Sequence, residues 1–237
     1  MSERFSRTEI MLGKDAVEKL QSSTVAVFGV GGVGGGAVEA LARGGIGHIV
    51  LIDSDTVSQS NINRQIIATQ SNVGKLKVEA AKERIKDISP DTKVTSINCF
   101  YLPENSSEFD FASYDYVVDA IDTVSAKIDI AVKCNENNVP MISAMGAGNK
   151  LDPSAFKVAD IYSTKVCPLA RAMRTALKKR NIKSLKCVYS EELPVRAAIE
   201  TELTHSGRPV PGSVSFVPPV MGYIMAGEVI KDLIKQY

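Results

Sequence analysis

A glycine-rich turn directly after an apolar run carries the strongest chemical signal in the sequence. The run TVAVF leads into GVGGVGGG, where Gly29, Gly31 and Gly34 satisfy G-x-G-x-x-G. Gly32 adds another position without a side chain, so backbone N–H groups can approach a phosphate at the positive N-terminus of the following helix. Asp53 ends the next apolar run, 22 residues after Gly31, where a carboxylate accepts hydrogen bonds from ribose hydroxyls. These residues predict a nucleotide site; a plain strand–helix connection is the alternative.

Further polar residues at fixed offsets go beyond what a dehydrogenase needs. They are Asp53 and Asp55 in D-x-D, Asn61 and Arg64 in N-x-x-R, Lys77, and Asp122 after a later apolar run. Because strand ends gather at the carboxyl edge of an open parallel sheet, these side chains can converge on one triphosphate. We expect Arg64 and Lys77 to face a solvated site and to neutralise phosphate oxygens. Asp122 is placed to hold Mg²⁺, which binds one or two carboxylates plus phosphates.

Length and composition indicate a globular protein of one large or two small domains. The chain has 237 residues, 44% of them hydrophobic and 23% charged, with a mean hydropathy of zero. The first residues have no apolar secretory segment, and prolines and glycines over 209–227 argue against a membrane span. The four cysteines form no C-x-x-C pair and the two histidines stand apart, so we expect no structural zinc. Scattered thiols are typical of a reducing, cytoplasmic location.

The spacing of apolar residues predicts strands that alternate with helices. Strands are expected over 25–28, 49–52, 93–98, 116–119, 139–143, 156–161 and 186–190, and helices over 15–20, 33–43, 76–88, 124–137, 169–180 and from Pro218 to the end. This alternation indicates an α/β fold with a Rossmann-like, doubly wound and mainly parallel sheet. After residue 152 the rhythm changes, which predicts an antiparallel C-terminal extension and a terminal helix. The polar segment 54–74 is long for a loop and is expected to be functional.

The overall charge of +1 conceals a basic segment. Between Asp160 and Glu191 there are eight basic residues and no acidic one, so the rest of the chain carries about −7. The eight are Lys165, Arg171, Arg174, Lys178, Lys179, Arg180, Lys183 and Lys186. Such a run is either a solvated helix face or a surface for a polyanion, most commonly a nucleic acid.

Together these motifs resemble the ubiquitin-activating-enzyme-like adenylyltransferases, over residues 4 to 169. The resemblance implies one adenylation domain over 1–237, with a nucleotide-binding core at about 20–150 and a substrate-binding extension at about 151–237. It implies that ATP is bound by the glycine turn, Asp53, Asp55 and Asn61. Catalytic roles fall to Arg64, Lys77 and Asp122, and to Arg7 of RFSR, which would reach the neighbouring subunit's ATP in a homodimer.

Finer motifs resemble the tRNA threonylcarbamoyladenosine dehydratase branch of that family. They are DAIDTVSAK at 119–127, the turn GAG at 146–148, VADIYSTKVCPLARAMRTALKK at 158–179 and KCVYSEE at 186–192. This branch adenylates the threonylcarbamoyl carboxylate of a modified tRNA, which then cyclises with release of AMP, pyrophosphate having left earlier. The basic residues Arg171, Arg174, Lys178, Lys179 and Arg180 would then contact tRNA.

Three alternatives stay open at this point. The chain could activate the C-terminus of a ubiquitin-like sulfur carrier, with a cysteine desulfurase or sulfur-acceptor system as partner. In that case Cys187 would be a reactive thiol whose pKa Lys186 lowers, although a buried strand cysteine is the other interpretation. The third alternative is a nicotinamide-dependent oxidoreductase or a non-catalytic nucleotide-binding module.

Overall fold

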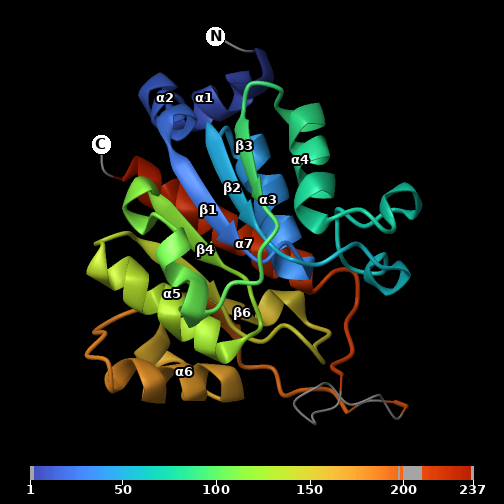
Figure 1. The fold of residues 1–237 in the computed structure, drawn as a ribbon, viewed down its shortest axis with the longest axis vertical. Coiled ribbons are helices and arrows are strands. Elements are labelled where there is room, and N and C mark those ends of the chain that lie inside the picture. Colours follow the sequence, from blue (N-terminus) through green and yellow to red (C-terminus); the bar gives the residue numbers. More distant parts are fainter. Residues whose placement is uncertain (1–2, 197, 200–209, 236–237) are drawn as a thin grey trace.

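Seven strands form one sheet at the centre of the computed structural model, which describes residues 3–196, 198–199 and 210–235 (Figure 1). They are β1 (Thr24–Phe28), β2 (His48–Ile52), β3 (Lys93–Ile97), β4 (Tyr116–Asp119), β5 (Met141–Ala144), β6 (Phe156–Asp160) and β7 (Lys186–Ser190). In the order β3-β2-β1-β4-β5-β7-β6, every neighbouring pair is parallel except β7 and β6. The predicted fold class, with its antiparallel C-terminal extension and terminal helix, is confirmed.

Helices cover both faces of this sheet. They are α1 (Ser6–Leu12), α2 (Lys14–Ser22), α3 (Gly32–Gly44), α4 (Lys77–Ile88), α5 (Val124–Glu136), α6 (Pro168–Lys178) and α7 (Pro218–Ile234). Val25 and Val27 of β1 belong to the core shared with α3, α4 and α7, whereas Ala26 and Phe28 belong to the core shared with α5 and α6. Strands buried on both faces explain the unbroken apolar runs in the sequence. None of the helices in 3–196 and 210–235 combines the length and apolar composition of a membrane-spanning helix.

Several element boundaries differ from those expected, for local reasons. Strand β5 begins at Met141 rather than residue 139, because Pro140 has no N–H to donate to the ladder. Helix α6 begins at Pro168 and ends at Lys178, shortly before Asn181 takes a left-handed φ of +58°. Helix α1 was not expected at all, since its apolar residues do not form one buried stripe.

Glycines let α7 lie directly against α3. A methyl group at Gly36 of α3 would lie 2.6 Å from the carbonyl oxygen of Pro219, at the start of α7. One at Gly222 of α7 would lie 2.1 Å from the carbonyl oxygen of Val33 in α3. Both distances are far shorter than a van der Waals contact, so these backbones meet only because side chains are missing. Helix α7 thereby holds α3, whose first turn follows β1, in place.

We predict that Gly222→Ala destabilises the protein by about 1–3 kcal/mol, because its methyl group would force two backbones apart. Gly227→Ala in the same helix is the matched control. A Cβ there meets no atom within 4 Å, so alanine should stabilise the helix by about 0.5–1 kcal/mol. Urea unfolding of both variants measures the difference, and equal effects at the two positions would contradict the close helix contact.

Candidate active site

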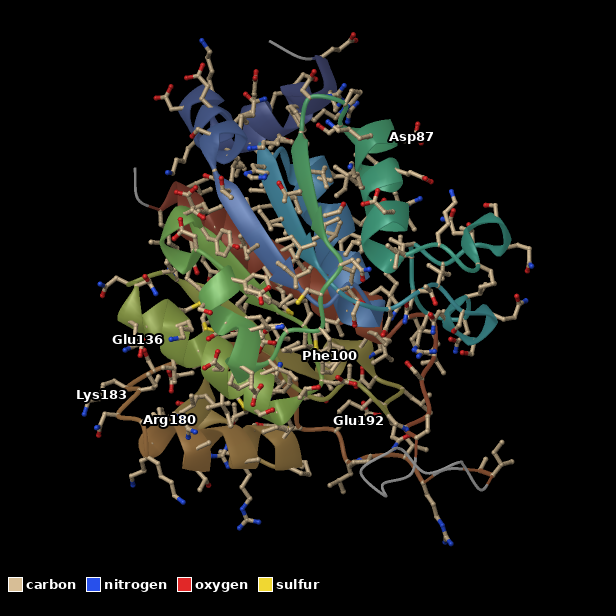
Figure 2. The ribbon with its side chains drawn as sticks, in the orientation of Figure 1. Asp87, Phe100, Glu136, Arg180, Lys183 and Glu192 are labelled. Atoms are coloured by element: carbon tan, nitrogen blue, oxygen red, sulfur yellow. The ribbon has the colours of Figure 1, made fainter. Side chains whose placement is uncertain are left out.

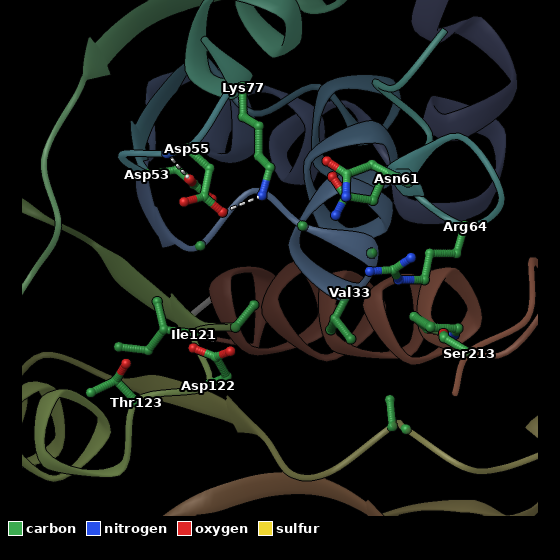
Figure 3. Close-up of a pocket in the computed structure, with 18 of the residues that line it drawn as sticks. Val33, Asp53, Asp55, Asn61, Arg64, Lys77, Ile121, Asp122, Thr123 and Ser213 are labelled. Atoms are coloured by element: carbon green, nitrogen blue, oxygen red, sulfur yellow. Dashed lines mark hydrogen bonds and ion pairs between the residues drawn. The ribbon is translucent and has the colours of Figure 1, made fainter. Parts of the chain in front are cut away.

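A cavity of about 400 Å³ lies at the carboxyl edge of the parallel strands (Figure 3). Its walls come from the turn after β1, the segment after β2, the start of α4, the turn after β4 and residues 211–213. The volume is in the range of small-molecule sites, roughly 300–1,000 Å³. Ligands of open α/β sheets bind at this edge, where the strand order reverses.

The glycines of the turn serve different purposes. Gly29 has φ +87°, and a Cβ there would lie 2.8 Å from the carbonyl oxygen of Ala120. A Cβ at Gly34 would lie 1.8 Å from the carbonyl oxygen of Gly29, so Gly34 allows α3 to approach β1 and does not itself line the cavity. Gly32 meets the first residue of α7 in the same way. Gly31 meets nothing nearer than 3.8 Å, so its backbone faces open space where a phosphate can approach.

Asp53 ties the end of β2 to this turn. Its Oδ2 accepts a hydrogen bond from the Val30 N–H at 2.7 Å, and its Oδ1 accepts one from the Asp55 N–H at 2.8 Å. Each carboxylate oxygen keeps a further lone pair, which a ribose hydroxyl can use. Asp53 therefore shapes the phosphate turn and can bind the sugar at the same time.

Lys77 enters the cavity from the first turn of α4 and contacts Asp55 (Figure 3). Its Nζ lies 2.6 Å from Asp55 Oδ2, and its backbone N–H donates to the Asp55 carbonyl at 2.9 Å. The side chain of Lys77 is only 7% exposed, whereas that of Asp55 is 62% exposed. The expectation that Lys77 faces a solvated site is wrong: packing around α4 buries its stem and leaves the ammonium directed at one carboxylate.

Arg64 and Asn61 lie on the segment between β2 and α4, across the cavity from Asp122 (Figure 3). Arg64 donates from Nη1 to the Ser60 carbonyl at 2.9 Å and to Asn63 Oδ1 at 2.8 Å. Asn61 Oδ1 accepts from the Ser58 N–H at 3.0 Å and so caps the short turn that carries both residues. The guanidinium retains further N–H donors for an anion.

Asp122 is an exposed carboxylate on the turn between β4 and α5. In the described part of the chain, no three His, Cys, Asp or Glu side chains gather as a self-sufficient metal site. One free carboxylate beside a phosphate-binding turn suits Mg²⁺, which takes its remaining ligands from phosphates and water. The residues present therefore fit a magnesium ion that arrives with a nucleotide.

Comparison with known proteins follows from this geometry. The model of the ThiF family matches residues 5–236. The chain belongs to the ThiF family. This ThiF-family chain is 43% identical over 244 residues to a tRNA threonylcarbamoyladenosine dehydratase of Bacillus subtilis, an alignment that covers 99% of this chain and 96% of the relative. It is 35% identical to the protein of that name from Haemophilus influenzae, with 99% and 94% covered.

Two crystal structures of the Escherichia coli tRNA threonylcarbamoyladenosine dehydratase resemble the ThiF-family chain closely. One is in complex with AMP and the other with ATP. Each has a TM-score of 0.89 and 34% sequence identity, over 99% of this chain and 95% of the other. The fold that surrounds the cavity is therefore one in which a relative holds ATP.

Several predicted residues of the ThiF-family chain lie away from the cavity. Arg7 is exposed on α1, beyond the end of the sheet where β1 begins (Figure 1). Arg174 is not free, because its Nη1 donates to the carbonyl and the hydroxyl of Thr164. Lys186 is paired with Asp232 of α7 at 2.6 Å. The remaining predicted tRNA contacts are exposed; they are Arg171, Lys178, Lys179 and Arg180.

Cys187 is fully buried in β7, where its Sγ donates to the Ala159 carbonyl at 3.4 Å. Burial raises the pKa of this thiol to about 12. The ammonium of Lys186, which was expected to lower that pKa, is instead engaged by Asp232 and Glu228. The thiol therefore stays protonated at neutral pH, which does not suit a nucleophile.

Two parts of the cavity wall were not predicted from the sequence. Gln65 is 6% exposed, and its Oε1 has no hydrogen-bond partner among the described residues. Its place next to Arg64 in NRQ is a signal that could have suggested it. The second part is the segment 211–213, which Asn63 fastens by donating to the Ser213 carbonyl at 3.0 Å. No local pattern in the sequence indicates that contact.

Proposed function

We propose that this chain is an ATP-dependent tRNA threonylcarbamoyladenosine dehydratase, a single-domain enzyme of the cytoplasm. The observation that carries the proposal is that near-full-length relatives bear that name while this chain has a phosphate turn, ribose carboxylate and cations around one cavity. The substrate's carboxylate attacks the α-phosphate of ATP, and pyrophosphate leaves. A nitrogen of the same threonylcarbamoyl group then attacks the acyl carbon, AMP leaves and a proton is released. The net change in the nucleoside is the loss of water.

Each part of ATP has a matching part of the cavity. The N-terminus of α3 and the open backbone at Gly31 bind phosphate, because their N–H groups and the helix dipole favour an anion. Asp53 binds the ribose. Arg64 and Lys77 reach the phosphates from opposite walls, and Lys77 exchanges its contact with Asp55 for a phosphate oxygen.

Asp122 would hold Mg²⁺ together with phosphate oxygens. When bound, the ion supplies positive charge that stabilises the departing pyrophosphate. The donor set of one exposed carboxylate next to a phosphate turn supports this placement. Arg64 and Lys77 add fixed positive charge around the same group, so that less solvent reorganisation is needed during the reaction.

We predict that Lys77→Ala or Arg64→Ala slows adenylation by about a hundredfold or more, the usual scale for removing a preorganised charge stabiliser. Because Lys77 is buried, Lys77→Met is the better test there: it keeps the packed stem and removes only the charge. Pyrophosphate exchange measures the rate, and thermal unfolding checks that each variant is folded. Folded variants with rates within a few fold of wild type would contradict these roles.

A homodimer in which Arg7 reaches the neighbouring subunit's ATP is part of the proposal. Arg7 is far from its own cavity, and α1 also exposes Ile10 and Met11, each 82% accessible. We predict that Arg7→Ala and Lys77→Ala chains, each inactive alone, regain partial activity when mixed, since one site of the hybrid would be complete. No recovery after proven subunit exchange would mean that Arg7 does not act across subunits.

The exposed cations of α6 and the turn after it form the proposed tRNA surface. Arg180 and Lys183 point outward beyond α6 (Figure 2). The structure narrows the predicted set, because Arg174 and Lys186 have partners within the protein. The tRNA phosphates are the expected partners, and their binding releases counterions.

We predict that reversing Lys178, Lys179 and Arg180 to Glu weakens tRNA binding and flattens its salt dependence. Log affinity should change by roughly 0.7–0.9 per lost phosphate contact per decade of salt. ATP affinity should not change, since none of the three lines the cavity. Reversal of Lys14, Lys19 and Lys82, which lie on α2 and α4, is the matched control. An unchanged slope would place the tRNA elsewhere.

A further inference from the structure

The turn that carries Asp122 stands on a charge pair sealed inside the protein. Asp119 is the last residue of β4 and Lys127 lies in the first turn of α5; both side chains are 0% exposed. Lys127 Nζ lies 2.8 Å from Asp119 Oδ2. The same oxygen accepts a hydrogen bond from the Ser143 hydroxyl at 2.5 Å. The pair thus joins β4, β5 and α5 beneath the cavity.

Stability does not explain such a pair. Taking two charges out of water costs several kcal/mol per ion, and their attraction roughly offsets this cost. Apolar side chains of the same volume often stabilise a core as well or better. The benefit of the Asp119–Lys127 pair must therefore be sought in what it orients.

The pair holds both backbone polar groups of Ile121. The Ile121 N–H donates to Asp119 Oδ1 at 3.4 Å, and the Ile121 carbonyl accepts from Lys127 Nζ at 3.2 Å. That carbonyl belongs to the peptide unit that joins Ile121 to Asp122. Fixing this unit fixes the direction in which the Asp122 side chain leaves the turn.

The other side of the turn is also restrained. The Ala120 N–H donates to the Phe28 carbonyl at 2.8 Å, and the missing Cβ of Gly29 leaves room for the Ala120 carbonyl. Asp122 itself is exposed on this restrained backbone. A flexible surface carboxylate is thereby given a fixed origin next to the phosphate turn.

We infer that Lys127, held in place by Asp119, is a positioning residue for Asp122. It does not touch the substrate; it acts by holding the Ile121–Asp122 peptide. The inference rests on the proposed function in one respect, because that proposal assigns Asp122 to the metal and phosphates of ATP. A misplacement of about 1 Å at such a group can slow a reaction on the order of a hundredfold.

The first test replaces both partners, since removing one would leave a buried charge unpaired and could unfold the chain. Asp119→Asn combined with Lys127→Met keeps shape and the acceptor for the Ile121 N–H, but removes the donor to the Ile121 carbonyl. We expect backbone hydrogen exchange over 119–124 to rise about tenfold or more while 24–28 stays protected. Unchanged exchange over 119–124 would overturn the inference, whatever the enzyme's activity.

The second test is a cycle of variants. The paired replacement should lower kcat for dehydration by about tenfold or more with little change in the KM for ATP. In the Asp122→Ala background the same replacement should cost at most about twofold, because its route of action is gone. Equal losses in both backgrounds would mean a general structural effect and would overturn the inference.

A matched control is the pair formed by Glu39 of α3 and Arg84 of α4, where the Glu39 side chain is 5% exposed. Glu39→Gln combined with Arg84→Met should leave kcat unchanged, since neither residue lines the cavity. If wild type does not dehydrate tRNA, the proposed function fails, while the exchange measurement still decides whether Lys127 holds the turn.

Discussion

The close approach of α3 to β1 is the constraint on which the rest of the site depends. A side chain at Gly34 would overlap the carbonyl of Gly29, and one at Gly222 would overlap that of Val33. Only glycine at these positions lets the first turn of α3 end at the cavity and lets α7 cover it from behind. Asp53 completes the arrangement by bonding the Val30 N–H. The phosphate turn is thus fixed by backbone contacts before any nucleotide arrives, which is the preorganisation that electrostatic catalysis requires.

Charges around the cavity are held by the same principle. Lys77 is buried and held by Asp55, and Arg64 is held by a carbonyl and an amide of its own segment. Each cation has a weak local partner that a phosphate can replace at little cost. Asp122 alone lacks such a partner, and the buried Asp119–Lys127 pair instead fixes the backbone beneath it. The site therefore combines exchangeable side-chain contacts with a rigid frame.

Much of the fold could be predicted from the sequence because its signals are local. Continuous apolar runs followed by glycine, Asp53 or Asp122 mark the ends of parallel strands, and those ends must meet at one edge. What could not be predicted depends on partners distant in the chain. Arg174 and Lys186 look as free as Lys178 in the sequence, and only tertiary packing brings Thr164 and Asp232 to them. Likewise, Asn63 and Ser213 are 150 residues apart.

The central claim is that this cavity uses ATP to remove water from a modified tRNA. Its most direct test is to incubate the purified chain with tRNA that carries threonylcarbamoyladenosine, with and without ATP, and to weigh the nucleosides by mass spectrometry after digestion. The account predicts an ATP-dependent loss of one water from that nucleoside, with one AMP and one pyrophosphate formed per event. A nucleoside of unchanged mass after incubation with a folded, ATP-binding chain would contradict it.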